Sequence, residues 1–383
     1  MHRKYWPRIL ISVCLSILSL TLASCASRGP ILLGLSVGLT GQYGDLGVQA
    51  RDGALLAVEA INENGGVGGR PIQLEIRDDL GTPEDAQRVD QELVEAGVVA
   101  IIGHITSQQT LAAYPITESA NVVLFSPTAS TPELSGKKDH FFRLVAPNPT
   151  EGQVLAQHIY QDRDLSKIAI IYEGDNQAFS SSLLDSFSKN YTELGGQLTH
   201  TIGYSSSGNP DFADLVKQMQ AFNPTDGLLI IAPPIDTALI AQHVRIADWS
   251  IPLFATAWSQ SQELISNGGK AVEGIEIPLT YDPNNQSSEY KDFQTRYQER
   301  FGKEPSLYAG ITYDVVFILA KALAKTGGEG EGLAEALVGT EIEGVANRVS
   351  LDEYGEVIRD WFLLTIQDGE YVTESKLRVQ VKN

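Results

Sequence analysis

The chain contains short runs of apolar residues that are not interrupted by polar positions. Two of them are VVAII at 98–102 and NVVLF at 121–125. Runs of this length without alternation are typical of strands in a parallel sheet whose two faces are both covered. Longer segments with helix signals lie between the runs, for example Thr82 followed by Pro83, a capping hydroxyl and a first-turn proline. The pattern therefore predicts strands that alternate with helices.

This alternation fills the first part of the chain and starts again after the sequence Pro-Asn-Pro at 147–149. In the first part we predict strands at 31–37, 72–76, 98–102 and 121–125, and helices at 48–62, from 82 onward and at 107–120, the last one kinked or shortened by Pro115. In the second part we predict strands at 167–172, 197–204, 228–231 and 252–256, and helices at 150–160, 179–194, 211–222 and 236–248. The second part thus repeats an architecture without repeating a sequence.

The remaining C-terminal part of the chain has a different pattern. Two long helices are predicted at 287–301 and 307–325, followed by two strands at 357–367 and 371–381 around Asp368-Gly369, a typical hairpin turn. The simplest packing returns the helices to the first lobe and the hairpin to the second. We therefore predict an α/β fold of two similar doubly wound parallel-sheet lobes joined by a three-crossover hinge.

Length and charge limit the possibilities further. The 383 residues are enough for two domains with full cores, which we place at 30–147 with 279–350 for lobe 1 and at 148–278 with 351–383 for lobe 2. The formal net charge of −20 argues against nucleic acid as a partner and against electrostatic docking on an anionic membrane.

The N-terminus carries an export signal. A basic segment ending at Arg8 precedes an apolar stretch at 9–20, which has the length of a signal peptide and is short for a membrane span. It ends in Leu-Ala-Ser-Cys at 22–25, which looks like a bacterial lipobox, and a cysteine at this point in a chain with only two favours that reading over a plain cleavage site. We predict a signal peptide at 1–24 and a lipid on Cys25 that anchors a folded domain in the cell envelope, on the periplasmic or extracellular face.

Hydroxyl and small residues follow two neighbouring predicted strands. The run VVAII ends in GHITSQQT, and the run NVVLF ends in SPTASTPEL. Open α/β sheets bind ligands outside the carboxyl ends of their strands. If Thr106 or Ser107 caps the helix that follows, the first N–H groups of that helix are free to hold an anion. These residues predict a pocket for a small molecule with a carboxylate or similar group; the alternative is that they are ordinary turn and capping residues.

Several short motifs lie in order along the chain, namely Leu39-Thr40-Gly41, Ala60-Ile61-Asn62, the glycine-rich run at 65–70, Asp78-Asp79, Ile102-Gly103-His104, Ser126-Pro127 and Thr131-Pro132-Glu133-Leu134. Together they resemble the type I periplasmic solute-binding proteins of the branched-chain amino acid (Leu/Ile/Val) transport family. The resemblance runs from about Ile31 to Val381. It implies the type I periplasmic binding fold and the binding of a small solute between the lobes.

The resemblance also implies a set of ligand-binding residues. The hydroxyl that binds the ligand carboxylate in the family falls on Ser107. The small turn that holds the carboxylate and the ammonium falls on Thr128, Ala129 and Ser130. The aromatic residue that closes over the ligand from the second lobe falls on Phe179.

The sequence departs from the family at the ammonium end of this site. The acidic residue expected just after the strand at 252–256 is missing, and Ala-Trp-Ser stands there at 257–259. A buried ammonium without a carboxylate partner is costly, which argues against an α-amino acid ligand. Glu173 or Asp175 could substitute from another direction, or both could be solvated loop acids.

Two further residues have both a functional and a structural interpretation. Trp258 follows a predicted strand, so it either lines the cleft and stacks on a ligand or packs beneath a loop. His104 is expected to be a structural histidine and not a metal ligand. The six histidines are scattered, and neither HExxH, CxxC nor a phosphate-binding loop occurs. We therefore expect no metal site, no cofactor and no enzymatic activity.

These observations predict a lipid-anchored, extracytoplasmic solute-binding protein of an ABC importer. A small polar organic ligand, such as an amino acid or a related carboxylate or amide, would dock on the first lobe, and the second lobe would then close over it. The closed monomer would be recognised by a membrane ABC permease. A ligand sensor, or a lipoprotein of the envelope that binds another protein, is the alternative on the same fold.

Overall fold

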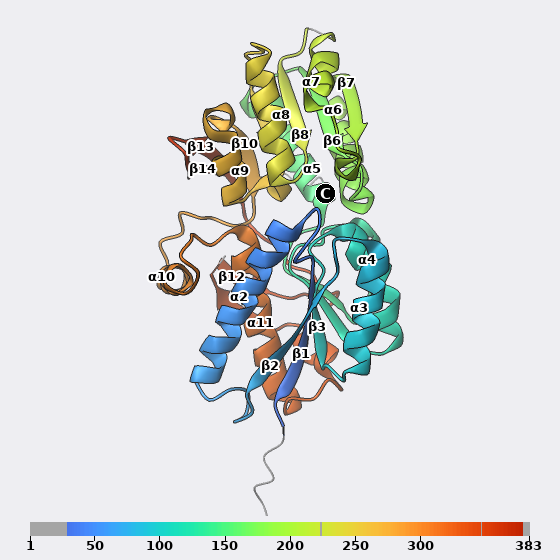
Figure 1. The fold of residues 1–383 in the computed structure, drawn as a ribbon, viewed down its shortest axis with the longest axis vertical. Coiled ribbons are helices and arrows are strands. Elements are labelled where there is room, and N and C mark those ends of the chain that lie inside the picture. Colours follow the sequence, from blue (N-terminus) through green and yellow to red (C-terminus); the bar gives the residue numbers. More distant parts are fainter. Residues whose placement is uncertain (1–28, 223, 346, 378–383) are drawn as a thin grey trace, which may run out of the picture.

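The computed structural model describes residues 29–222, 224–345 and 347–377, which form two lobes stacked along the long axis of the molecule (Figure 1). The predicted signal peptide and Cys25 lie outside the described residues. The chain passes between the lobes three times, after β5 (Phe141–Arg143), after β10 (Glu276–Leu279) and after β12 (Asn347–Ser350). The prediction of an α/β fold with mostly parallel sheets in two lobes is confirmed.

The first lobe is built on a five-stranded sheet whose strands are all parallel, in the order β2-β1-β3-β4-β5. The other strands are β1 (Ile31–Val37), β2 (Ile72–Asp78), β3 (Ala100–Gly103) and β4 (Val123–Ser126). The helices α2 (Gly44–Glu63), α3 (Pro83–Glu95) and α4 (Ser107–Ser119) connect these strands, and α4 continues past Pro115. Thr82 caps α3 through the N–H of Asp85, as the sequence predicts.

Both faces of this sheet are buried, which explains its uninterrupted apolar runs. In β3, Ile101 packs into a core cluster with Leu93 of α3 and Leu124 of β4. Ile102, its neighbour in sequence, packs into a different cluster on the opposite face. Successive side chains of a strand point to opposite faces of the sheet. Because both faces of this sheet are covered, every position of β3 is buried and none is occupied by a polar residue.

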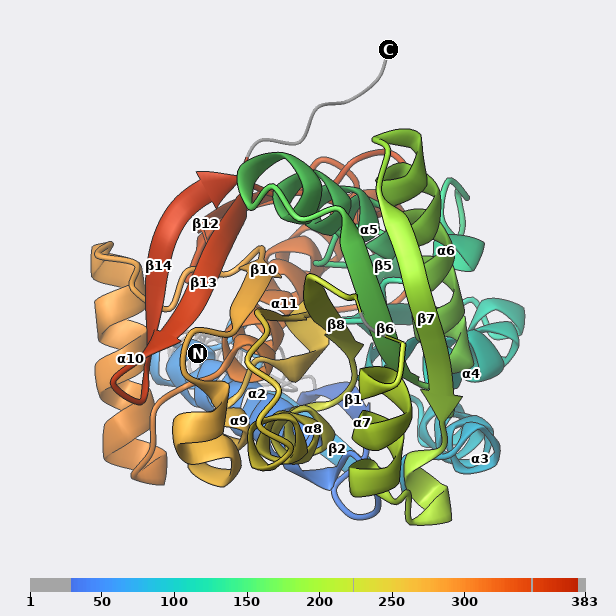
Figure 2. The same cartoon turned by 90° about the horizontal axis from the view of Figure 1, so that it is seen from above.

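The second lobe is built on a seven-stranded sheet in the order β14-β13-β10-β9-β8-β6-β7, which Figure 2 shows from above. Its remaining strands are β6 (Lys167–Glu173), β7 (Gln197–Tyr204), β8 (Gly227–Ile231), β9 (Leu253–Ala255), β13 (Trp361–Gln367) and β14 (Glu370–Leu377). Its helices are α5 (Asn148–Gln157), which continues as a π-helical turn to Asp162, α6 (Gln177–Glu193), α7 (Phe212–Gln220), α8 (Pro234–Ile246) and α9 (Gln262–Gly268). The hairpin β13–β14 turns at Asp368-Gly369, as predicted.

The sequence did not reveal β5 or β10. β5 has only three residues, and β10 contains Pro278, which normally argues against a strand inside a sheet. β10 pairs with β9 at Glu276 alone, whereas all four of its residues pair with β13. Pro278 therefore lies beyond the ladder with β9, where its missing N–H costs no hydrogen bond in that ladder.

The helices that follow β10 pack against the first lobe. They are α10 (Ser288–Phe301), α11 (Leu307–Thr326) and the short α12 (Leu333–Leu337), and they precede a two-stranded sheet of β11 (Glu341–Gly344) and β12. Within the described residues, α11 is long and apolar enough to cross a membrane, but 78% of its apolar window is buried inside the protein. α11 is thus a core helix that packs along α2.

The contact between α2 and α11 depends on a glycine. A Cβ added at Gly53 would overlap the backbone carbonyl of Ala309 in α11. Alanine would favour the helix by about 1 kcal/mol in isolation, but the overlap forces two core helices apart, and overpacking of this kind costs about 1–3 kcal/mol. We expect Gly53→Ala to lower the free energy of unfolding, measured by urea denaturation.

Gly208→Ala is the matched control, because a Cβ there would meet only ordinary van der Waals contacts and the residue needs no left-handed backbone. Equal stability of the Gly53→Ala protein and the wild type would contradict the prediction.

Candidate functional site in the cleft between the lobes

A cavity of about 60 Å³ lies between the lobes, at the carboxyl ends of β3 and β4. Ile105, Ser107, Thr128 and Ser130 line it from the first lobe. Glu151, Asn176, Phe179 and Trp258 line it from the second lobe, together with Trp361 at the start of β13. One water needs about 10–15 Å³ on this scale, so the cavity has room for a small molecule.

Ser107 joins the two loops that carry the first-lobe side of the cavity. Its Oγ accepts hydrogen bonds from the N–H groups of Ser130 at 3.1 Å and Thr131 at 3.2 Å. Its own proton has no acceptor among the described residues. Because the oxygen is already an acceptor twice, the hydroxyl can only donate to a further partner, and a ligand carboxylate is such a partner.

The amino end of α4 faces the same space. Thr106 caps the helix by accepting from the N–H of Gln109 at 3.3 Å, and the N–H of Gln108 donates to Asn176 Oδ1 at 3.1 Å. In the part of the chain that the structure describes, the N–H of Ser107 has no acceptor. One free amide and one free hydroxyl at a helix N-terminus form a site for an anion.

The turn after β4 contributes two of its three predicted residues to the cavity wall. Thr128 donates its hydroxyl proton to the carbonyl of Ile105 at 2.7 Å, so toward the cavity its oxygen can only accept. The hydroxyl of Ser130 has no partner within the described ranges. Ala129 is not on the wall: it is fully buried, and its N–H donates to Ser126 Oγ at 2.9 Å, which leaves no group to meet a ligand.

Aromatic rings form the second-lobe side of the cavity. Phe179 and Trp258 are both buried, with ring centroids 5.2 Å apart in an edge-to-face arrangement. Trp258 also lies 5.9 Å from Tyr43, in the glycine-rich turn of the first lobe. Trp258 therefore belongs to the cleft and is in contact with both lobes, so the cleft interpretation of this residue fits the structure.

Hydrogen bonds across the cleft show that the lobes are closed on one another. The side-chain oxygen of Gln108 accepts from the backbone N–H of Ala178 at 3.1 Å, and the backbone N–H of Gln108 donates to the side chain of Asn176. A third bond runs from the hydroxyl of Tyr308 in α11, which donates to the carbonyl of Trp258 at 2.8 Å. These bonds join the ligand-facing segments of the two lobes directly.

Neither of the acids considered as ammonium partners lines the cavity. The carboxylate of Glu173 accepts from the N–H groups of Asp175 at 2.7 Å and Asn176 at 3.1 Å, and burial raises its pKa to about 7. Asp175 accepts from the N–H of Ser207 at 3.0 Å. Both acids therefore shape the loop before α6, and the position of Asn176 depends on them.

The cavity wall instead carries an acid that the sequence did not reveal, Glu151 in the first turn of α5. It is 4% exposed, and its Oε1 accepts from the N–H of Ala257 at 2.6 Å. Burial raises its pKa to about 8, against the opposing effect of that hydrogen bond. In sequence Glu151 is an ordinary first-turn acid next to a helix dipole, and only the packing of α5 shows that it faces the cleft.

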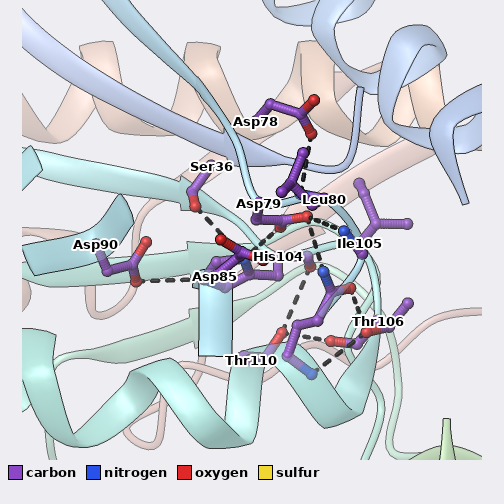
Figure 3. Close-up of polar contacts among 12 residues, drawn as sticks. Ser36, Asp78, Asp79, Leu80, Asp85, Asp90, His104, Ile105, Thr106 and Thr110 are labelled. Atoms are coloured by element: carbon purple, nitrogen blue, oxygen red, sulfur yellow. Dashed lines mark hydrogen bonds and ion pairs between the residues drawn. The ribbon is translucent and has the colours of Figure 1, made fainter. Parts of the chain in front are cut away.

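A buried ion cluster supports the first-lobe side of the site (Figure 3). His104 lies between two aspartates, with Nδ1 at 2.6 Å from Asp79 and Nε2 at 3.3 Å from Asp90, and all three side chains are fully buried. Gln109 of α4 donates to the other oxygen of Asp79 at 2.7 Å. The carbonyl of His104 accepts from Ser126 Oγ at 2.8 Å. The cluster thus connects β2 and α3 to both loops of the site.

The two aspartates keep the imidazole charged. Burial alone would lower the pKa of His104, but the charge of Asp90 and the hydrogen bond to Asp79 outweigh it and raise the pKa to about 10. His104 is therefore an imidazolium at neutral pH and is a structural residue, as the sequence analysis expected. Among the described residues, no group of three His, Cys, Asp or Glu side chains is placed to hold a metal ion.

Removal of the imidazolium should destabilise the first lobe. In His104→Ala, Asp79 and Asp90 would stay buried without a cation, and Asp90 would lose the ion pair with His104 that is its one side-chain contact of this kind among the described residues. Breaking a buried pair in this way costs about 3–5 kcal/mol. We expect a loss of this size in urea unfolding, with His243→Ala on α8 as a control that changes little.

The ion pairs of His104 with Asp79 and Asp90 also predict how the stability of the protein changes with pH. Because the pKa of His104 is higher in the folded chain than its ordinary value of 6.5, its stabilisation is complete below about pH 6.5 and is lost as the pH rises toward 10. The difference in unfolding free energy between wild type and His104→Ala should therefore narrow between pH 7 and pH 10. A difference that stays constant over this range would contradict a charged His104.

Comparisons with known proteins agree with this architecture. The family model for the periplasmic binding protein matches residues 30–370. The Leu/Ile/Val-binding protein homolog 1 of Brucella suis is 28% identical over 340 residues, 85% of this chain and 87% of that protein. A binding protein for leucine, isoleucine, valine, threonine and alanine from Pseudomonas aeruginosa is 25% identical over 341 residues, with coverages of 85% and 86%.

A solved structure shows the same similarity. The crystal structure of a leucine-binding protein from Thermotoga maritima superposes with a TM-score of 0.84 at 26% identity, covering 91% of this chain and 98% of that one. The match extends through both lobes and the hinge. The chain belongs to the periplasmic binding protein family, and its resemblance to the solute-binding proteins of branched-chain amino acid ABC transporters is confirmed.

Proposed function

We propose that this protein is a lipid-anchored, extracytoplasmic solute-binding protein of an ABC importer, and that it captures a small polar organic molecule in the cleft between its lobes. The ligand class is an amino acid or a related carboxylate or amide. The observation that carries the proposal is the free N–H and hydroxyl of Ser107 at the amino end of α4, opposite the aromatic rings of Phe179 and Trp258.

Each part of the cavity has a role in this proposal. The carboxylate of the ligand accepts hydrogen bonds from Ser107 and benefits from the positive end of α4. The apolar body of the ligand lies against Phe179 and Trp258, where its surface is removed from water. The relatives named above are all named for the binding of leucine, two of them also for isoleucine and valine and one of these for threonine and alanine as well, which agrees with a ligand that has a carboxylate and a mostly apolar body.

Closure of the lobes is the signal that reaches the transporter. The carboxylate site lies on the first lobe and the aromatic wall lies mainly on the second, so a ligand that contacts both favours the closed form. The bonds of Gln108 to Asn176 and Ala178 then add to this preference. The closed form is the one that a membrane permease would recognise, because only in this form do both lobes present a fixed joint surface.

Ligand binding can be tested on residues 26–383 by thermal shift with the common amino acids, short carboxylates including benzoate, and amides. A ligand at 100 times its Kd stabilises the native state by about 2.7 kcal/mol, which gives a clear rise in melting temperature. We expect Ser107→Ala and Phe179→Ala each to weaken the binding of a hit at least about tenfold. Ser107→Ala removes a hydrogen bond to a charged group, which contributes about 1.5–3 kcal/mol, and Phe179→Ala removes the apolar surface that buries the body of the ligand.

Matched controls for these variants are Ser119→Ala, at the exposed far end of α4, and Phe222→Ala, a partly exposed ring of the second lobe. Both should bind like the wild type in isothermal titration calorimetry. If a ligand binds the Ser107→Ala and Phe179→Ala variants with the same affinity as the wild type, it binds elsewhere and the proposed site is wrong.

The anchor is tested separately on the full-length chain expressed in a bacterium. Cys25→Ser removes the thiol that would carry the lipid, so the protein should move from the detergent-soluble membrane fraction to the aqueous fraction or remain as an unprocessed precursor. Cys14→Ser, inside the apolar part of the signal peptide, is the control and should leave the fractionation unchanged. Membrane association of the Cys25→Ser protein equal to that of the wild type would refute lipid anchoring.

A further inference from the structure

The cavity wall carries one carboxylate and no base. Glu151 is the acid, and none of the described residues that line the cavity is Lys, Arg or His. Its carboxyl has one hydrogen-bond donor among the described residues, the N–H of Ala257. A buried carboxyl with a single neutral donor is poorly compensated in its ionised form, because desolvation of the charge is opposed by only one dipole.

A purely structural role does not require an acid at this position. Glutamine would accept the N–H of Ala257 with its amide oxygen and would bring no ionisable group into the cavity. The first-turn position next to the dipole of α5 favours an acid, but burial raises the pKa of Glu151 in spite of that dipole, so the dipole does not compensate for the desolvation of the charge. The ionisable carboxyl, nearly fully buried and aimed into a ligand cavity, therefore suggests a partner that the chain itself does not supply.

We propose that Glu151 takes the place of the acid that is missing after β9 and is the counter-ion for a cationic nitrogen of a zwitterionic ligand. This inference rests on the proposed function and extends it. The carboxylate of the ligand meets Ser107 and the end of α4, and its ammonium donates to Glu151. Thr128 supplies a second acceptor for the ammonium, because its hydroxyl proton is already used by Ile105.

The other titratable group that faces Glu151 is Tyr308 of α11. Tyr308 lines the same cavity, and burial together with the charges of Asp45 and Glu151 raises its pKa well above the ordinary value. Tyr308 is thus neutral at any pH of interest and donates to the carbonyl of Trp258. From the second lobe, the elements next to α5 place Asn176, Phe179 and Trp258 on the wall, none of which titrates.

This role fixes the sign of the pH dependence of binding. Glu151 holds a proton in the free protein below about pH 8, and an ammonium binds only the ionised carboxyl, so binding at pH 6 to 7 must release that proton. Affinity should rise with pH, by up to about tenfold per unit, until pH 8. A neutral Glu151 that donates to a ligand carboxylate would give the opposite sign, with no proton release and weaker binding above pH 8.

The experiment compares pairs of ligands by isothermal titration calorimetry at pH 6, 7 and 8 in buffers of different ionisation enthalpy. Each pair is an amino acid and the acid of the same skeleton without the amine, for example L-leucine with 4-methylpentanoate and L-valine with 3-methylbutanoate. We expect an amino acid to bind with release of close to one proton at pH 6. At pH 8, where Glu151 is no longer mainly protonated, the partner without the amine should bind at least about 30-fold more weakly, because the ammonium–carboxylate pair is lost.

Glu151→Gln provides the second test. At pH 8 it should weaken binding of the amino acid at least about 30-fold, and it should abolish the pH dependence, while the melting temperature of the ligand-free protein does not fall. Asp236→Asn is the control, because Asp236 is a partly buried acid of the same lobe that accepts from Tyr204 and does not line the cavity. The pH and proton-release data on the wild type stand even where the variant fails to fold.

The outcomes separate this inference from the proposed function. Acids without an amine that bind as well as amino acids, or amino acid affinity that survives Glu151→Gln, would overturn the role of Glu151 and leave the cleft as a carboxylate site. If neither member of any pair binds the wild type while an amide or another neutral compound does, the role of Glu151 and the carboxylate site fall together.

Discussion

One hydroxyl oxygen holds the two halves of the first-lobe site in register. Ser107 Oγ accepts the N–H groups of Ser130 and Thr131, so the loop after β3 and the loop after β4 are bonded at the point where a ligand would sit. Without that bond, two backbone donors would be buried at the end of a strand with no acceptor, which is costly. Because these two bonds use the oxygen of Ser107 as an acceptor, its hydroxyl proton remains available to a ligand. The bonds that hold the two loops together therefore also leave a hydrogen-bond donor at the site.

The hinge is connected to this site through Arg143, which is fully buried at the end of β5. Its guanidinium donates to the carbonyl of Thr131 at 2.7 Å and to Glu356 at 2.6 Å, and its backbone N–H donates to the carbonyl of Gly355 at 3.0 Å. The turn after β4 is therefore bonded to the third crossover. When the lobes close, the crossovers bend. The turn after β4, which faces the ligand, stays bonded to the third crossover through Arg143.

Much of this could be predicted from the sequence because the signals are local. Uninterrupted apolar runs predicted strands with two buried faces, and the hydroxyl-rich ends of two of them indicated the side of the cleft that holds Ser107, Thr128 and Ser130. The role of Phe179 was predicted from the family resemblance alone, because an aromatic residue at the start of an amphipathic helix is normally expected to pack in the core. The wall contributed by Asn176, Tyr308 and Trp361 could not be predicted, because each lies far from the others in sequence and faces the cavity only through lobe closure.

Glu151 and Ala129 show that the local sequence does not determine which side chains face the cavity. Ala129 was predicted to bind the ligand and is not on the wall, whereas Glu151 was not predicted and is on the wall. Ala129 sits in the right turn, but Ser126 takes its N–H, and no feature of the local sequence specifies which of three small residues turns inward. Glu151 follows a Pro-Asn-Pro boundary and reads as an acid that complements a helix dipole. Its orientation is a property of how α5 packs beneath the segment 257–259, to which it is bonded through Ala257.

The distribution of charge around the cleft favours a zwitterionic ligand. In the segment after β9 the sequence lacks the acid that its family resemblance leads one to expect, and this is the segment that Glu151 reaches from another helix. With no base on the described cavity wall, a ligand that is only an anion would have to rely on dipoles and hydroxyls while it sits near an acid. A zwitterion avoids this conflict, since its cation neutralises the acid and its anion meets the end of α4. Each charged group in the filled cavity then faces an opposite charge or a helix dipole, so the two lobes close over no uncompensated charge.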